Sequence, residues 1–184
     1  MIPGSSSSIS PSDAEIVQDV LKGRKEAFSK LVDRYHRLVR MVIWNFFHNC
    51  SEIDDYCQES FLKAFLNLRG LDDPQRFKKW LLKIACRICL DVKRRKAPQE
   101  DLMQDIPEGI LPEDHDAQKP FNEMEMKNLL EILPPDDRVI LWLKYVEGYG
   151  YDDISSMFQA SEAAIRQKAS RAMKVLRERL KHEL

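Results

Sequence analysis

Residues 161–184 combine two side-chain types that can read base edges in the major groove of DNA. Arginine can donate two hydrogen bonds to guanine and glutamine can bond to adenine, so Arg166 and Gln167 are candidate base readers. Three further basic residues suit contacts with the phosphate backbone, namely Lys168, Arg171 and Lys174. The alternative is that all five are solvated residues on the outer face of an ordinary amphipathic helix.

A second basic group lies in the middle of the chain, on one side of an expected helix. Its candidate nucleic-acid contacts are Lys83, Arg87, Lys93, Arg94 and Arg95. Basic residues at a helix C-terminus also complement the helix dipole, which is the simpler explanation of the last three. Nearby, Phe77 and Trp80 could stack on unpaired bases, but aromatic residues at helical spacing are more often part of a core.

Charge is segregated along the chain although the formal net charge is only -1. Residues 62–96 hold 11 basic residues against 3 acidic ones, and residues 161–184 hold 7 against 3. Between them, residues 97–125 hold 9 acidic residues and 1 basic residue. Two segments should therefore attract phosphate, and the segment between them should repel it.

Cysteine spacing raises the question of metal or redox chemistry. Cys86 and Cys89 have the CxxC spacing of such sites, and Cys57 could come near them in a helical bundle. Cys57 and Cys89 nevertheless fall on apolar stripes, where a reduced cysteine behaves as a small buried hydrophobe. We predict reduced thiols, no metal and no cofactor, and leave a role for the CxxC pair open.

The elements that must position these residues are helices. Apolar residues recur at helical spacing in residues 13–22, 28–47, 53–69 and 74–96, and these segments should share one core. Ser12 and Glu15 have capping-box spacing, and Ser51 and Asp54 are expected to cap the third helix.

A second, smaller bundle is expected over residues 123–184. It has a break at Pro134 and Pro135, and then a helix-turn-helix outline in which Ser161 caps the long last helix. Residues 97–122 are rich in proline and acid and predict a flexible acidic linker. The fold class is therefore all-α, with a first domain at residues 13–96 and a second at 123–184.

No apolar stretch is free enough of charge to cross a membrane. Residues 1–12 are rich in serine and proline and lack the basic and apolar regions of a secretory signal. We expect a cytoplasmic protein whose first 12 residues are disordered.

Three segments resemble a known family in their residues and in their order. Residues 54–65 (DDYCQESFLKAF) resemble the polymerase-binding helix of bacterial sigma factors, and residues 77–85 (FKKWLLKIA) resemble their promoter-melting helix. In the second bundle, residues 133–135, 145–154 and 161–180 resemble the domain that reads the upstream promoter element. The chain is thus similar to the small extracytoplasmic-function (ECF) sigma factors over residues 13–96 and 123–181.

This resemblance implies partners and roles. It implies binding to core RNA polymerase through Asp55, Gln58, Glu59 and Leu62, binding to promoter DNA, and control by an anti-sigma factor. It assigns the second basic group and residues 70–75 to opening of the downstream promoter element. It assigns reading of the upstream element to Arg166, Gln167, Lys168 and Arg171. It also implies a regulatory subunit that is not an enzyme.

Two departures from the family pattern leave the DNA sequence open. Arg87 stands where many relatives have asparagine, and Ala163 and Ala164 replace a common Gly-Thr pair. Two other functions stay as alternatives. One is a helix-turn-helix transcription regulator that binds an operator and whose first bundle senses a ligand or dimerises, and the other is a sigma-like decoy that binds an anti-sigma factor without initiating transcription.

Overall fold

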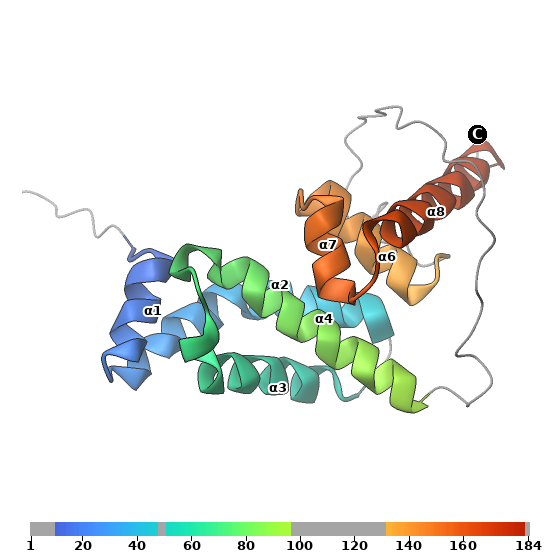
Figure 1. Cartoon of the computed structure of the whole chain (residues 1–184). Helices are drawn as coiled ribbons and strands as arrows, with labels where there is room; N and C mark the ends of the chain where they lie inside the picture. Colours follow the sequence, from blue (N-terminus) through green and yellow to red (C-terminus); the bar gives the residue numbers. More distant parts are fainter. Residues whose placement is uncertain (1–9, 48–50, 97–131, 183–184) are drawn as a thin grey trace, which may run out of the picture.

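A computed structural model describes residues 10–47, 51–96 and 132–182, and within these ranges every regular element is helical (Figure 1). The first bundle consists of α1 (Asp13–Leu21), α2 (Phe28–Phe47), α3 (Ile53–Leu66) and α4 (Phe77–Lys96), with short 3-10 turns η1 (Lys25–Ala27), η2 (Leu68–Gly70) and η3 (Pro74–Arg76). The second consists of α6 (Pro135–Leu141), the π-helical turn η4 (Trp142–Val146), α7 (Tyr151–Phe158) and α8 (Glu162–His182). The predicted all-α fold class is confirmed.

The first bundle forms because α2, α3 and α4 each bury one apolar stripe against the other two. α1 packs against α2 and begins at the predicted capping box, where the Glu15 amide donates to Ser12 Oγ at 3.3 Å and Glu15 Oε2 accepts from the Ser12 amide at 2.7 Å. The Ser12 amide and the Ser12 hydroxyl, which donates to Glu15 Oε2 at 2.8 Å, lower the pKa of Glu15.

The predicted cap of α3 is wrong. The helix begins at Ile53, its N-cap is Glu52, and no side chain caps it. Asp54 lies inside the first turn and pairs instead with Arg40 of α2. The Glu52 carboxylate accepts from Tyr56 Oη at 2.9 Å and from Lys96 Nζ at 2.6 Å, so it ties α3 to the end of α4. The acidic residues near this helix start therefore serve tertiary contacts rather than capping.

The second bundle contains the predicted helix-turn-helix. α7 ends at Phe158, its C-cap Gln159 adopts the left-handed conformation with φ 55°, and α8 begins after Ser161. Ser161 Oγ accepts from the Ala164 amide at 3.2 Å, so the predicted cap is confirmed. Ile154, Met157 and Ile165 are buried between the helices and fix their crossing.

The two bundles are in contact, with α7 against α4 and α6 against α2 (Figure 1). The predicted linker at residues 97–122 and the part of the second domain before residue 132 lie outside the described residues, as do residues 1–9. Of the helices in the described ranges, none has the length and apolar character needed to cross a bilayer.

Candidate protein-docking and nucleic-acid surfaces

The outward face of α3 carries acidic and apolar side chains together. Asp55 and Gln58 are exposed, Glu59 pairs with Lys63 at 2.7 Å, and Leu62 remains 54% exposed. The opposite face of the helix is buried against α2 and α4. Exposed leucines rimmed by acidic groups are typical of a protein-binding surface.

Leu66 extends this face by one turn and was not predicted as a site residue. It is 68% exposed, the largest fraction among the exposed large hydrophobic residues of the described ranges. Its spacing of four from Leu62 places both on the same side of the helix, which was a signal in the sequence that could have identified it. We define the docking face as Asp55, Gln58, Glu59, Leu62 and Leu66.

The aromatic residues of α4 belong to the core. Phe77 is fully buried and its ring lies 6.2 Å from Phe28 and 5.9 Å from Tyr35. Trp80 is partly buried, with its ring centroid 6.1 Å from that of Phe77. The interpretation of core packing is therefore confirmed for Phe77.

The predicted nucleic-acid residues of α4 fall into two groups. Arg87, Arg94 and Arg95 are exposed, and the last two interact locally with Asp91. Lys83 and Lys93 instead point to the second bundle: Lys83 Nζ donates to Ser156 Oγ at 2.6 Å and Lys93 pairs with Asp136. Burial lowers the pKa of Lys83, with smaller contributions from Arg87 and Lys79.

Two more lysines of α4 join the same contact, which sequence reasoning missed. Lys78 pairs with Glu147 at 2.8 Å and Lys79 pairs with Asp153 of α7. We define the lysine interface as these contacts of Lys78, Lys79, Lys83 and Lys93. It was not foreseeable, because the partners lie more than 40 positions away in the sequence.

Arg138 of α6 anchors the contact between the bundles. It is only 4% exposed, and its guanidinium donates to the Asn45 carbonyl of α2 and to the Leu133 carbonyl, each at 2.9 Å. The Asn45 carbonyl belongs to the last turn of α2, where the helix dipole favours a cation. Beside it, the Phe46 and Phe158 rings lie 6.0 Å apart. Sequence reasoning missed this residue.

The second helix of the helix-turn-helix, α8, is the candidate recognition helix, and its predicted residues lie in different settings. Arg166 donates to Glu162 Oε1 at 2.5 and 3.0 Å, and its guanidinium lies 4.5 Å from the centre of the buried Tyr151 ring. Arg171 and Lys174 are exposed, and Gln167 is half-buried. An arginine held by an ion pair and an aromatic ring is preorganised, so less side-chain entropy is lost when it binds.

Lys168 faces the acidic start of α6. Its Nζ lies 3.7 Å from Asp137 Oδ1 and 4.0 Å from Asp136 Oδ2. Burial raises the pKa of Asp137, and the neighbouring Asp136 adds to this, while Lys168 opposes it. Asp136 therefore connects α4 with the recognition helix through Lys93 and Lys168.

The described cysteines are buried thiols. Cys57, Cys86 and Cys89 form no disulfide, and burial raises the pKa of Cys86 to about 12. Within the described ranges, no group of three His, Cys, Asp or Glu side chains is arranged to hold a metal ion. A thiol that stays protonated is a poor nucleophile and a poor metal ligand.

These thiols should be unreactive in the native protein. We expect a neutral alkylating reagent at pH 8 to leave Cys86 and Cys89 unmodified, because burial both blocks access and holds the pKa of Cys86 near 12. Mass spectrometry of the peptides, before and after unfolding in guanidinium, measures this. Rapid modification of either thiol in the folded protein would contradict the assignment.

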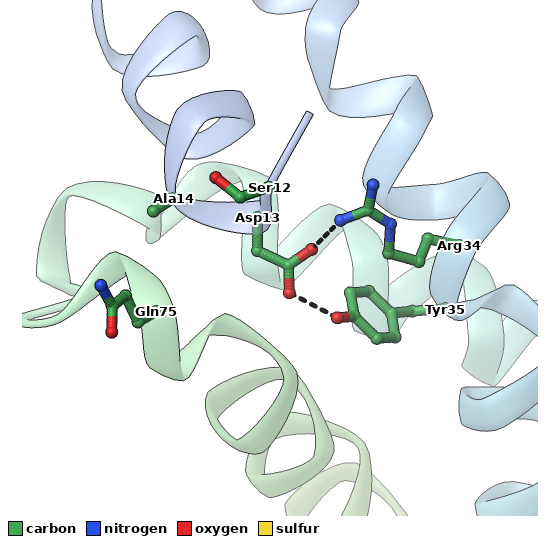
Figure 2. Close-up of a pocket in the computed structure, with 6 residues that line it drawn as sticks. All are labelled: Ser12, Asp13, Ala14, Arg34, Tyr35 and Gln75. Carbon is green, nitrogen blue, oxygen red and sulfur yellow. Dashed lines mark hydrogen bonds and ion pairs between the residues drawn. The ribbon is translucent and has the colours of Figure 1, made fainter. Parts of the chain in front are cut away.

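A shallow pocket lies between α1, α2 and the η3 turn (Figure 2). Asp13 in its wall is bonded to both Arg34 and Tyr35, and Arg34 Nη2 also donates to the Pro11 carbonyl at 2.7 Å. Burial, followed by the bond to Asp13, raises the pKa of Tyr35. These groups satisfy one another and tie α1 to α2, so we interpret the pocket as structural.

Comparison with known proteins identifies each of the two bundles. Residues 31–99 match the family model of sigma-70 region 2, and residues 123–176 match that of sigma-70 region 4. The chain belongs to the ECF family of RNA polymerase sigma factors. The family membership predicted from the sequence is thereby confirmed, and the two bundles of this sigma factor are called region 2 and region 4 below.

Similar proteins span nearly the full length of this sigma factor. It is 25% identical to the ECF sigma factor SigW of Bacillus subtilis, over 90% of this chain and 95% of that protein. It is 29% identical to the sigma-H factor of Pseudomonas aeruginosa, over 89% and 91% of the two chains.

The fold also matches solved structures. One is CnrH in complex with the cytosolic domain of CnrY, at 19% identity with a TM-score of 0.63, covering 95% of this chain and 100% of that one. Another is RpoE in complex with the anti-sigma factor NepR from Bartonella quintana, at 18% identity with a TM-score of 0.61, covering 84% and 96%. At this identity, the likeness supports the shared fold.

Proposed function

We propose that this sigma factor docks on core RNA polymerase through the α3 face, opens the downstream promoter element with the basic side of α4, and reads the upstream element with α8. The observation that carries the docking assignment is that Leu62 and Leu66 stay exposed beside Asp55 and Gln58. An apolar pair that the fold leaves open is suited to a partner surface.

Region 2 supplies positive charge where DNA strands would separate. Arg87, Arg94 and Arg95 are exposed on α4 and can hold phosphate, which is the main source of affinity for a nucleic-acid backbone. Residues 70–75 precede this helix and are assigned to holding an unstacked base. A captured base repays part of the cost of unstacking through contacts in its pocket.

Region 4 reads the duplex through the start of α8. Arg166, supported by Glu162 and Tyr151, is assigned to a base edge, and Arg171 and Lys174 are assigned to phosphates. Gln167 and Lys168 complete the surface.

Replacing Arg166 should therefore reduce specificity, whereas replacing Lys174 should reduce affinity in general. Arg166→Ala is expected to weaken binding to the preferred upstream element by about 1–3 kcal/mol and to leave other duplexes little changed. Lys174→Ala should weaken all duplexes nearly equally. Fluorescence anisotropy with a preferred and a scrambled duplex distinguishes the two, and an equal loss on both duplexes for Arg166→Ala would remove the base-reading role.

Membership of this family also suggests how the chain is regulated and where in the cell it acts. An anti-sigma factor is proposed as the partner that controls this sigma factor, supported by the likeness to RpoE in its complex with NepR. We further propose that the chain acts in the cytoplasm, where core polymerase is found, and that it is a regulatory subunit without catalytic activity of its own.

Strand opening tests this function. Promoter fragments retained by core polymerase plus the sigma factor can be selected from a library and probed with permanganate, which oxidises unpaired thymines. We expect permanganate to detect unpaired thymines only when core polymerase and the sigma factor are both present. Binding of duplex DNA by the chain alone, with no opening after core is added, would favour a helix-turn-helix regulator.

A further inference from the structure

The lysine interface places region 4 on the side of region 2 that is assigned to single-stranded promoter DNA. Four lysines of α4 engage Glu147, Asp153, Ser156 and Asp136 of region 4. Each of these lysines is at least partly shielded, whereas Arg87, Arg94 and Arg95 on the same helix stay exposed. The contact therefore neutralises one stretch of the basic surface.

The acidic partners bind the lysine ammonium groups that DNA phosphates would also bind. Carboxylate oxygens of Glu147 and Asp153 accept from lysine ammonium groups just as phosphate oxygens do. Because one ammonium group cannot hold both at the same short distance, region 4 and a DNA strand compete for these lysines. The competition is intramolecular, so region 4 has the advantage of a high effective concentration.

The ion pairs of the lysine interface are weak enough to allow the two bundles to separate. Its ion pairs are partly exposed, with side-chain accessibilities of 34% and 23% for Lys79 and Asp153, and such pairs are weak and screened by salt. Beside the lysine interface, the two bundles also meet at Arg138, which donates to the Asn45 carbonyl, and at the Phe46–Phe158 ring contact. Interfaces of this mixed character between domains resemble transient protein contacts.

The docking face, by contrast, remains open in the same arrangement. Leu62 and Leu66 are exposed on α3, while the lysines of α4 are engaged with region 4. A partner can therefore bind α3 before the bundles part.

From this geometry we propose that region 4 inhibits the downstream-element surface of the free chain through the lysine interface, and that core polymerase docks on α3 of this closed form before the interface opens. The proposal rests on the proposed function in one respect, which is that α4 binds the opened strand. It adds that the free chain binds single-stranded DNA more weakly than it would if region 4 did not cover the lysines of α4.

The test uses the full chain, without polymerase, and a fluorescent mixed-sequence single-stranded DNA. The double variant Glu147→Gln/Asp153→Asn removes both acidic partners. Its matched control, Asp152→Asn/Glu178→Gln, removes the same charge from exposed positions, and within the described residues no ion pair joins these two to α4. If the closed form holds nine-tenths of the molecules, the interface variant should bind about tenfold more tightly than wild type, and the control should bind little differently.

A second variant is expected to move in the opposite direction. Ser156→Asp gives Lys83 a carboxylate in place of a hydroxyl and should weaken DNA binding. Ser155→Asp, one residue earlier on α7, adds the same charge and should weaken binding less. Small-angle scattering should show the Glu147/Asp153 variant expanded relative to wild type.

The outcomes separate this inference from the proposed function. If the interface variant and its control bind the strand equally, and scattering shows no expansion, the closed form is not inhibitory. If the interface variant binds more tightly but neither it nor wild type opens promoters with core polymerase, the inhibition stands and the sigma function fails. We expect the interface variant to open promoters with core polymerase as wild type does. In the absence of core polymerase, we expect it to bind single-stranded DNA more tightly than wild type.

Discussion

Leu62→Asp is expected to weaken binding of the chain to core RNA polymerase by roughly 30-fold or more. A central apolar residue of an interface contributes about 2 kcal/mol or more, and each 1.4 kcal/mol corresponds to a factor of about ten. Leu62 is 54% exposed, so the fold itself should tolerate the change. Titration of labelled chain with core polymerase measures the dissociation constant.

Leu21→Asp is the matched control, because Leu21 is also exposed, at 40%, but lies on α1 away from the docking face. It should leave the affinity for core unchanged. Equal affinity of wild type and Leu62→Asp for core polymerase would mean that α3 does not dock as assigned. Leu66→Asp would then show whether the contact is centred on Leu66 instead of Leu62.

Arg138→Met should give the largest loss of stability. The substitution keeps an unbranched side chain out to about the position of Nε but leaves the Asn45 and Leu133 carbonyls without their guanidinium donor in a buried place. Each unsatisfied buried group costs about 1–3 kcal/mol, so the two carbonyls together should cost about 2–6 kcal/mol. Urea unfolding followed by circular dichroism measures the change in free energy of unfolding.

Arg171→Met supplies the comparison for this experiment, because Arg171 is exposed on α8. Surface substitutions of this kind usually change stability by less than about 0.5 kcal/mol. A similarly small effect of Arg138→Met would show that the contact with α2 does not hold the bundles together.

Most of the helices could be predicted because apolar periodicity is a local property. The capping box at Ser12 and the cap at Ser161 were likewise encoded within four residues. The cap of α3 was predicted wrongly for a reason that is not local. Asp54 pairs with Arg40 on another helix, and that contact depends on the tertiary arrangement.

The candidate site was predictable in part. The resemblance supplied the docking residues around Leu62, and helical spacing would have added Leu66. The contact of Arg166 with the Tyr151 ring and the burial of Arg138 depend on the tertiary packing of the helices. No local sequence pattern predicts them. The same holds for the lysine interface, where the sequence gives only basic and acidic residues on distant segments. The roles of the predicted residues of α4 and α8 as DNA contacts stay a prediction.

Run-off transcription tests the central claim most directly. Core polymerase is combined with wild-type chain, with the double variant Gln58→Ala/Glu59→Ala of the docking face, or with Leu21→Asp, on a library of promoter fragments. We predict transcripts with wild type and with Leu21→Asp, and their loss in the double variant. Binding of duplex DNA by the wild-type chain, with no transcripts from any fragment when core is present, would contradict the account.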